Sequence, residues 1–177
     1  MDVRRCYSAM RLSDLLRLAA IALLLTACSH IRPKPQIPVS RGPNPLHHHG
    51  EQAANDILFR AIGLVGTPYR YGGNTPEGGF DCSGLVGYVF RDAAGINLPR
   101  TSDEISRLEA PDVRRDDLES GDIVLFSQRG RTVTHVGIYV GAGRFVHAPN
   151  EGGTVRLDAL DDTYWKDHFS GAKRLAM

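Results

Sequence analysis

The sequence has few cysteines, no excess of charge of either sign and no long hydrophobic stretch. Its 177 residues include three Cys, and 21 Lys and Arg stand against 20 Asp and Glu, a formal net charge of +1. Because no basic excess is available to displace counterions from phosphates, this balance argues against a nucleic-acid-binding protein. A composition of 42% hydrophobic and 23% charged residues excludes disorder and collagen-like repeats, and the length fits one domain with tails.

Two common kinds of ligand site are also missing. The glycine-rich segment from Thr67 to Gly79 contains no Gly-Lys-Ser/Thr and is therefore not a phosphate-binding loop. The run His47–His49 cannot converge on one ion from a rigid element, so we predict a solvated loop there rather than a metal site. The sequence thus predicts neither a metal nor a cofactor.

The N-terminus has the pattern of an export signal. Arginines precede an apolar run over residues 18–27, which is shorter than the roughly 20 residues needed to span a bilayer. The run ends in Leu25-Thr26-Ala27-Cys28, which resembles the bacterial lipoprotein box. In such a box the cysteine thiol receives a diacylglyceryl group and the chain is cut just before it. A plain cleaved signal with an incidental Cys28 is the alternative.

This interpretation divides the chain into three parts. We expect a signal peptide over 1–27, a lipidated Cys28 with a proline-rich tether over 28–50, and a catalytic domain over 51–177. Attachment to the membrane would then come from the lipid. In a cell with two membranes, Ser29 resembles signals for sorting to the periplasmic side of the outer membrane; with one membrane, the anchor would lie in the cell membrane.

Hydrophobic periodicity predicts an α+β fold, with N-terminal helices packed on a central antiparallel sheet, because helical patterns come first and strand patterns follow. The expected helices cover residues 51–65, 82–94 and 101–108, the last capped by Thr101 or Ser102. The expected strands cover residues 123–126, 133–140, 144–148 and 155–157, followed by a helical turn and a strand within 164–175.

Cys82 is the cysteine that processing would leave unmodified, because Cys6 lies in the signal and Cys28 would be acylated. It opens the second predicted helix, where the backbone N–H groups and the helix dipole lower a thiol pKa and can bind an oxyanion. A buried structural cysteine is the alternative, and Cys82 alone does not decide between the two.

Two histidines follow on neighbouring strands. Strand alternation places His135, Gly137 and Tyr139 on one face, and the turn Gly141–Gly143 makes a hairpin with the strand that contains His147. Because 135 and 147 differ by an even number, the two rings should share a face, opposite or one diagonal apart, within about 4.5–8 Å. Cys82, His135 and His147 then suit a nucleophile, a base and a group that orients the base.

Several motifs in order resemble the NlpC family of cell-wall cysteine peptidases. They are Gly66-Thr67-Pro68-Tyr69-Arg70-Tyr71-Gly72-Gly73, Asp81-Cys82-Ser83-Gly84, Leu98-Pro99-Arg100, Gly121-Asp122-Ile123-Val124-Leu125-Phe126, His135-Val136-Gly137-Ile138-Tyr139 and Phe145-Val146-His147-Ala148. The lipid-anchored layout is most similar to the Spr-type murein endopeptidase lipoproteins of that family. The resemblance implies a reduced papain-like fold and the peptide of peptidoglycan as substrate.

The resemblance also implies roles for individual residues. Cys82 matches the nucleophile, His135 the base and His147 the orienting polar residue. Tyr69 matches a tyrosine that helps to bind substrate or the oxyanion. The neighbours of the nucleophile, Asp81 and Ser83, match residues that contact a substrate amine in some members, and the role of Arg100 stays open.

Two other functions remain possible from the sequence. One is a catalytically silent lipoprotein that binds peptidoglycan and recruits other hydrolases, although a pure binder has no use for a nucleophile. The other is a thiol acyltransferase or lipid deacylase on a related fold. For the peptidase, His147 can accept a hydrogen bond from His135 only while one of its ring nitrogens is unprotonated. An ordinary imidazole pKa of about 6.5 for His147 therefore predicts activity that falls through the mildly acidic range.

Overall fold

The computed structural model describes residues 45–128, 130 and 132–176. The predicted signal peptide, the lipidation site Cys28 and most of the tether lie outside these residues. The chain forms four helices in the described part: α2 (Pro45–Gly63), α3 (Cys82–Ala94), α4 (Ser102–Ser106) and α5 (Thr163–His168). A short 3-10 helix, η2, covers Arg115–Asp117. No helix among the described residues has the length and apolar character needed to cross a membrane.

The strands form one large antiparallel sheet and one small hairpin. The hairpin pairs β1 (Asn74–Thr75) with β2 (Gly79–Phe80). The large sheet has the order β3-β8-β4-β5-β6-β7. Its strands are β3 (Asp112–Val113), β4 (Ile123–Phe126), β5 (His135–Gly141), β6 (Arg144–His147), β7 (Arg156–Ala159) and β8 (Phe169–Lys173).

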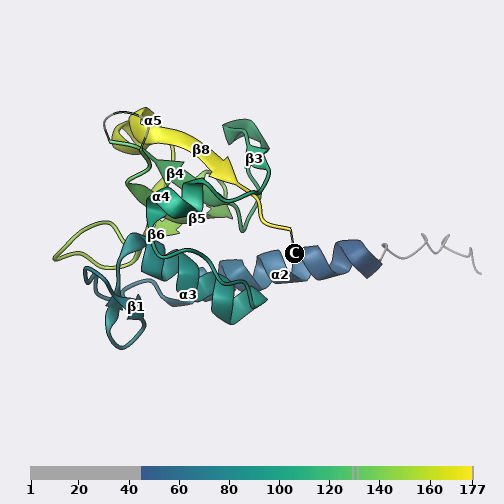
Figure 1. Cartoon of the computed structure of the whole chain (residues 1–177), viewed down its shortest axis with the longest axis horizontal. Coiled ribbons are helices and arrows are strands. Elements are labelled where there is room, and N and C mark those ends of the chain that lie inside the picture. Colours follow the sequence, from purple (N-terminus) through teal and green to yellow (C-terminus); the bar gives the residue numbers. More distant parts are fainter. Residues whose placement is uncertain (1–44, 129, 131, 177) are drawn as a thin grey trace, which may run out of the picture. The chain divides into compact units, whose positions relative to one another are not determined.

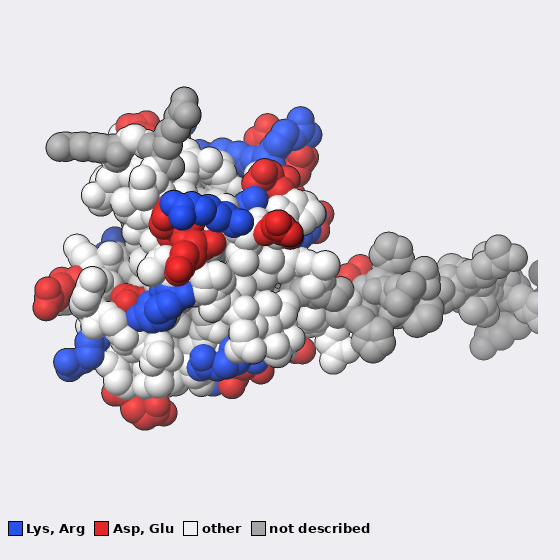
Figure 2. All heavy atoms as spheres, viewed as in Figure 1, with Lys and Arg blue, Asp and Glu red and all other residues white. Residues whose placement is uncertain are grey.

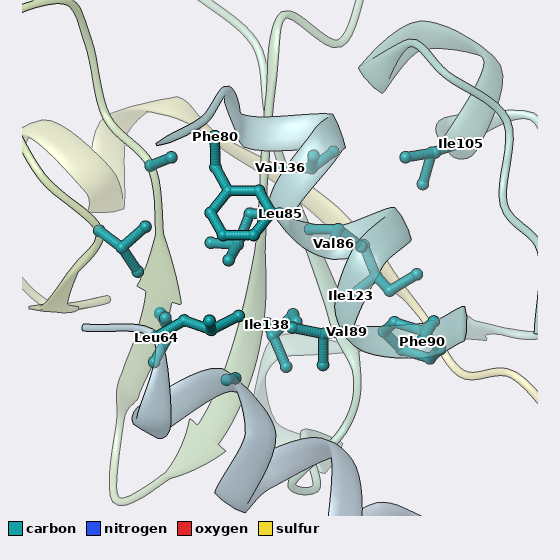
Figure 3. Packing of buried hydrophobic residues seen from close by; sticks show 14 of the residues in the cluster. Leu64, Phe80, Leu85, Val86, Val89, Phe90, Ile105, Ile123, Val136 and Ile138 are labelled. Carbon is teal, nitrogen blue, oxygen red and sulfur yellow. The ribbon is translucent and has the colours of Figure 1, made fainter. Parts of the chain in front are cut away.

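The sheet separates two hydrophobic clusters. α2 and α3 lie together on one side and contact β5, whereas α5 lies on the other side (Figure 1). Figure 3 shows the larger cluster, in which Leu85, Val89 and Phe90 of α3 pack on Ile138 of the sheet. Trp165 of α5 packs on Phe126 and Phe145 in the smaller cluster. β4 is buried on both faces because it contributes to both clusters, which explains its uninterrupted Ile-Val-Leu-Phe sequence.

The surface on the face drawn in Figure 2 has basic and acidic side chains interspersed. Ion pairs also join residues far apart in the sequence, such as Arg174 and the buried Asp122, Nε to Oδ1 at 2.8 Å. This pattern agrees with the near-zero net charge of the sequence.

The predicted order of elements is confirmed, and the boundaries differ in a few places. The tether was expected to reach residue 50, but α2 begins at Pro45, so His47–His49 lie in a helix and not in a loop. Proline is favoured in the first turn of a helix, where no partner for its missing amide hydrogen is needed. α4 ends at Ser106 rather than 108, and its N-cap is Thr101, which forms a capping box with Glu104. The two-residue strands β1, β2 and β3 were not predicted, because they are too short for a periodic signal.

The first turn of α3 is packed tightly against the loop that precedes it. Asp81 is the N-cap, and its Oδ1 accepts a hydrogen bond from the Gly84 amide at 2.7 Å. The carbonyl of Gly73 accepts from the Asp81 amide at 3.1 Å. A Cβ added at Gly84 would lie 2.0 Å from that carbonyl oxygen, whereas one at Gly87 on the same helix would meet nothing within 4 Å. Glycine at 84 therefore sets how closely the helix tip approaches the loop.

We expect Gly84→Ala to destabilise the fold by about 2 kcal/mol or more, because either the loop or the helix must move. Gly87→Ala is the matched control on the same helix and should be neutral or stabilising by up to about 1 kcal/mol, since alanine has the higher helix propensity. Urea unfolding followed by circular dichroism measures both. Equal stabilities for the two variants would contradict the close approach.

Candidate active site

Cys82 is the first residue of α3 and is half-buried. Its sulfur lies among the backbone N–H groups of Val136, Ser83 and Cys82 itself, which favour the thiolate. Burial acts in the opposite direction and is the larger effect, and the negative charge of Asp81 adds to it, so the pKa of the Cys82 thiol is raised. The expectation of a lowered thiol pKa at the helix tip is therefore wrong: desolvation outweighs the helix end.

The two histidines meet as the strand alternation predicted. β5 and β6 pair Ile138 with Val146 and Tyr139 with Phe145, a register that places His135 and His147 one diagonal apart. Their rings are perpendicular with centroids 5.1 Å apart, and His135 Nε2 lies 2.9 Å from His147 Nδ1. Gly137 leaves room for the neighbouring strand and its side chains, because a Cβ there would lie 2.7 Å from Phe145 Cδ2 and 3.3 Å from His147 Cβ.

Asp158 of β7 extends this pair and was not among the predicted site residues. His147 Nε2 lies 3.0 Å from Asp158 Oδ2, and the side chain of His147 is fully buried. The same oxygen accepts hydrogen bonds from Trp165 Nε1 at 2.9 Å and from Arg156 Nη2 at 2.9 Å. The predicted strand covered 155–157 and so ended one residue before Asp158. Strand alternation places Asp158 on the same face as Arg156, which pairs with His147, so a longer predicted strand would have included it.

Aromatic side chains bury the imidazoles. Trp165 stacks on His135 with ring centroids 5.3 Å apart, and it meets His147 edge-on at 4.7 Å. Burial is the main reason why the pKa of His135 is lowered to about 3, with the neighbouring His147 acting in the same direction. Burial also lowers the pKa of His147 to about 4, against the opposing effect of Asp158. Both rings are therefore neutral at physiological pH.

Cys82 and His135 line the same cavity of about 210 Å³, together with Tyr69 and Trp165. A second cavity of about 450 Å³ begins at Cys82 and extends over Asp81, Ser83 and Arg100. Tyr69, Cys82 and Thr134 line both cavities. The nucleophile candidate thus lies where the two halves of an open groove meet, and His135 lies in only one half.

The remaining predicted residues surround this junction. Burial and the nearby Cys82 and Asp81 raise the pKa of Tyr69, so its hydroxyl stays protonated and can donate a hydrogen bond. Asp81 forms a bidentate ion pair with Arg100, Oδ1 to Nη1 at 2.9 Å and Oδ2 to Nη2 at 2.7 Å. The Ser83 hydroxyl donates to the Arg100 carbonyl at 2.7 Å. Arg100, whose role the sequence left open, therefore fixes both residues that flank Cys82.

Metal ligation is not supported by the arrangement of donors. In the part of the chain that the structure describes, no three side chains of His, Cys, Asp or Glu are grouped so that they could hold one ion. The chemistry available to the groove is that of a thiol, a neutral imidazole, a phenol and backbone N–H donors at a helix end.

Comparisons with known proteins identify relatives of the chain. Over 127 residues the chain is 44% identical to the murein DD-endopeptidase MepH of Escherichia coli, an alignment that covers 71% of this chain and 47% of MepH. Over 170 residues it is 35% identical to the protein named murein DD-endopeptidase MepS/murein LD-carboxypeptidase from the same species, with 88% of each chain covered. The crystal structure of an NlpC/P60 family protein from Bacillus cereus superposes with a TM-score of 0.66 at 29% identity, covering 70% of this chain and 40% of the other.

The alignment covers about half the length of MepH but 88% of MepS. The relatives therefore differ in how much sequence they have outside the shared domain. The shared part is the papain-like α+β fold that the sequence predicted, with the helix that begins at Cys82 packed on the sheet that contains His135. Residues 66–174 match the NlpC/P60 family. The chain therefore belongs to the NlpC/P60 family.

Proposed function

We propose that the chain is a cysteine peptidase that hydrolyses amide bonds in the stem or cross-linking peptides of peptidoglycan. The observation that carries the proposal is that Cys82, at the tip of α3, lines one cavity with His135, whose ring is hydrogen-bonded to His147. The relatives MepH and MepS are named murein endopeptidases, which supports peptidoglycan as the substrate.

The resting site contains a neutral thiol and a neutral imidazole. As the Cys82 sulfur attacks the amide carbonyl carbon, its proton passes to the free nitrogen of His135. The carbonyl oxygen becomes an oxyanion, and its proposed hydrogen-bond donors are the backbone N–H of Cys82 and the protonated Tyr69 hydroxyl. Because the proton moves during the attack, no separated charge pair needs to persist in the buried site.

The second half of the reaction reverses this proton transfer. His135 gives its proton to the departing amine as the carbon–nitrogen bond breaks, which leaves a thioester on Cys82. Water then attacks the thioester and passes a proton to His135. The thiolate leaves, takes that proton back and releases a carboxylic acid. Because His135 lines only one of the two cavities, the leaving amine lies in that cavity and the acyl part of the substrate lies beside Arg100.

We further propose that Cys28 is the lipidated N-terminal residue of the mature chain. The support is the sequence alone, an apolar run that ends in Leu-Thr-Ala-Cys. The lipid would place the enzyme beside its substrate, on the periplasmic side of the outer membrane in a cell with two membranes. The tether that follows would determine how far the domain reaches from the membrane.

Cys82→Ala should abolish cleavage of purified peptidoglycan, a fall on the order of 10⁴-fold or more, because the nucleophile is lost. Mass spectrometry of the released muropeptides measures the products and identifies the bond that is cut. Unchanged circular dichroism would show that the variant is folded. Undiminished product formation would contradict the peptidase and leave the silent peptidoglycan-binding lipoprotein as the better account.

The pH dependence should differ from that of an exposed histidine. The pKa of His135 is lowered, so its basic form is fully present in the mildly acidic range and is lost only as the pH falls toward about 3. We therefore expect kcat/KM to be nearly constant between pH 5 and 8, which corrects the expectation drawn from an ordinary imidazole. An acid limb centred near pH 6.5 would contradict the burial of the pair.

Replacing Cys28 by Ala should abolish incorporation of radiolabelled palmitate and release the protein from the membrane fraction, since the acylated thiol is removed. Labelling of cells that express either form, followed by fractionation, measures both effects. Cys6→Ala is the matched control and should label as the unmodified chain does. Palmitate incorporation that survives the loss of Cys28 would contradict the lipid anchor.

A further inference from the structure

Asp158 lies behind the two histidines and is held by three neighbouring side chains. Its Oδ2 lies 3.0 Å from His147 Nε2, and it accepts from Trp165 Nε1 and Arg156 Nη2 at 2.9 Å each. Burial acts to raise the pKa of Asp158, but the hydrogen bonds from Arg156 and Trp165 outweigh it, and the pKa is lowered. The group is therefore a carboxylate, which accepts hydrogen bonds and cannot donate them.

An acceptor at this position determines which nitrogen of His147 carries the proton. Because Asp158 only accepts, the neutral His147 must carry its hydrogen on Nε2 and leave Nδ1 as an acceptor. His135 Nε2 lies 2.9 Å from that Nδ1 and must in turn carry a hydrogen. The remaining nitrogen of His135, Nδ1, then has the free lone pair that a base requires.

We propose that Asp158 is a positioning residue that fixes the tautomers of both histidines, so that His135 presents an unprotonated Nδ1 to the thiol. The inference rests on the proposed function and adds a fourth member to its set of residues. Asp158 does not touch the substrate in this account and acts only through His147.

The opposite tautomers would block the base. If His147 carried its hydrogen on Nδ1, that N–H would face His135 Nε2, which would then have to be the acceptor. His135 would carry its hydrogen on Nδ1 and could no longer take the proton of Cys82. Removal of Asp158 lifts the bias against this arrangement, because His147 Nε2 loses its hydrogen-bond acceptor.

The charge of Asp158 also favours the step in which His135 becomes cationic. The groups that shift the pKa values of the two rings electrostatically are the rings themselves on β5 and β6 and Arg156 and Asp158 on β7. Phe126 of β4 and Trp165 of α5 pack on the rings. The other titratable side chains that line the cavity of His135 are Tyr69, Cys82, and Tyr164 and His168 of α5. Asp158 favours the protonated form of both rings, while Arg156 disfavours that of His147. Proton transfer from the thiol to His135 should therefore become less favourable without Asp158.

The direct test is ¹⁵N NMR of the protein labelled at histidine, at neutral pH. In the wild type we expect both His135 and His147 as the Nε2–H tautomer, assigned with His135→Gln and His147→Gln. Asp158→Ala should convert a substantial fraction of His147 to the Nδ1–H form and lower kcat by about 10²-fold or more, with KM little changed. Asp161→Ala is the matched control, because its exposed carboxylate pairs with Arg115. It should change neither the tautomer of His147 nor kcat.

Each alternative result overturns the positioning role. If His147 of the wild type is found as the Nδ1–H tautomer, the positioning role is overturned. This test needs no Asp158 variant, so it is valid even if Asp158→Ala fails to fold. A folded Asp158→Ala that keeps both Nε2–H tautomers also overturns it, whether or not kcat falls. Failure of the peptidase proposal is separate, because it would appear as product formation that survives Cys82→Ala.

Discussion

The hydrogen-bond chain from Asp158 through His147 to His135 is the interaction on which the site depends. It runs across three neighbouring strands and lies under Trp165, so both imidazoles are held neutral and in one orientation. A neutral imidazole that shares a cavity with a neutral thiol avoids the cost of keeping two charges in a buried site. The order of the sheet, with β5, β6 and β7 adjacent, is therefore as important to the chemistry as the helix that bears Cys82.

Close approach of backbones holds the tip of α3 against the loop that precedes it. Gly84 lets the first turn of α3 contact the Gly73 carbonyl, and Gly137 leaves room for Phe145 and His147 on the neighbouring strand. Arg100 then links Asp81 and Ser83 on either side of Cys82. Gly84 and the Asp81–Arg100 ion pair thus help to determine where the Cys82 sulfur lies. The large hydrophobic side chains stabilise the packing of α3 on the sheet.

Local patterns were sufficient to predict much of this arrangement. The bounds of α3 and β4 follow from caps and from an apolar run, and the shared face of His135 and His147 follows from even spacing across a hairpin. Asp158 was missed because its partner lies on another strand and the predicted strand stopped at 157. The raised pKa of Cys82 and the lowered pKa of His135 were missed because burial, the main cause of both shifts, is a property of the packed fold. The start of α2 at Pro45 was missed because proline was taken as part of the tether.

The rate at which iodoacetamide alkylates Cys82, followed as a function of pH, tests the neutral thiol–imidazole pair most directly. Because alkylation requires the thiolate and burial raises the pKa of this thiol, the account predicts a slow rate at neutral pH. The rate should rise only above the pH at which an ordinary cysteine ionises. A fast, constant rate between pH 5 and 7 that disappears in His135→Ala would reveal a thiolate–imidazolium pair and contradict the account.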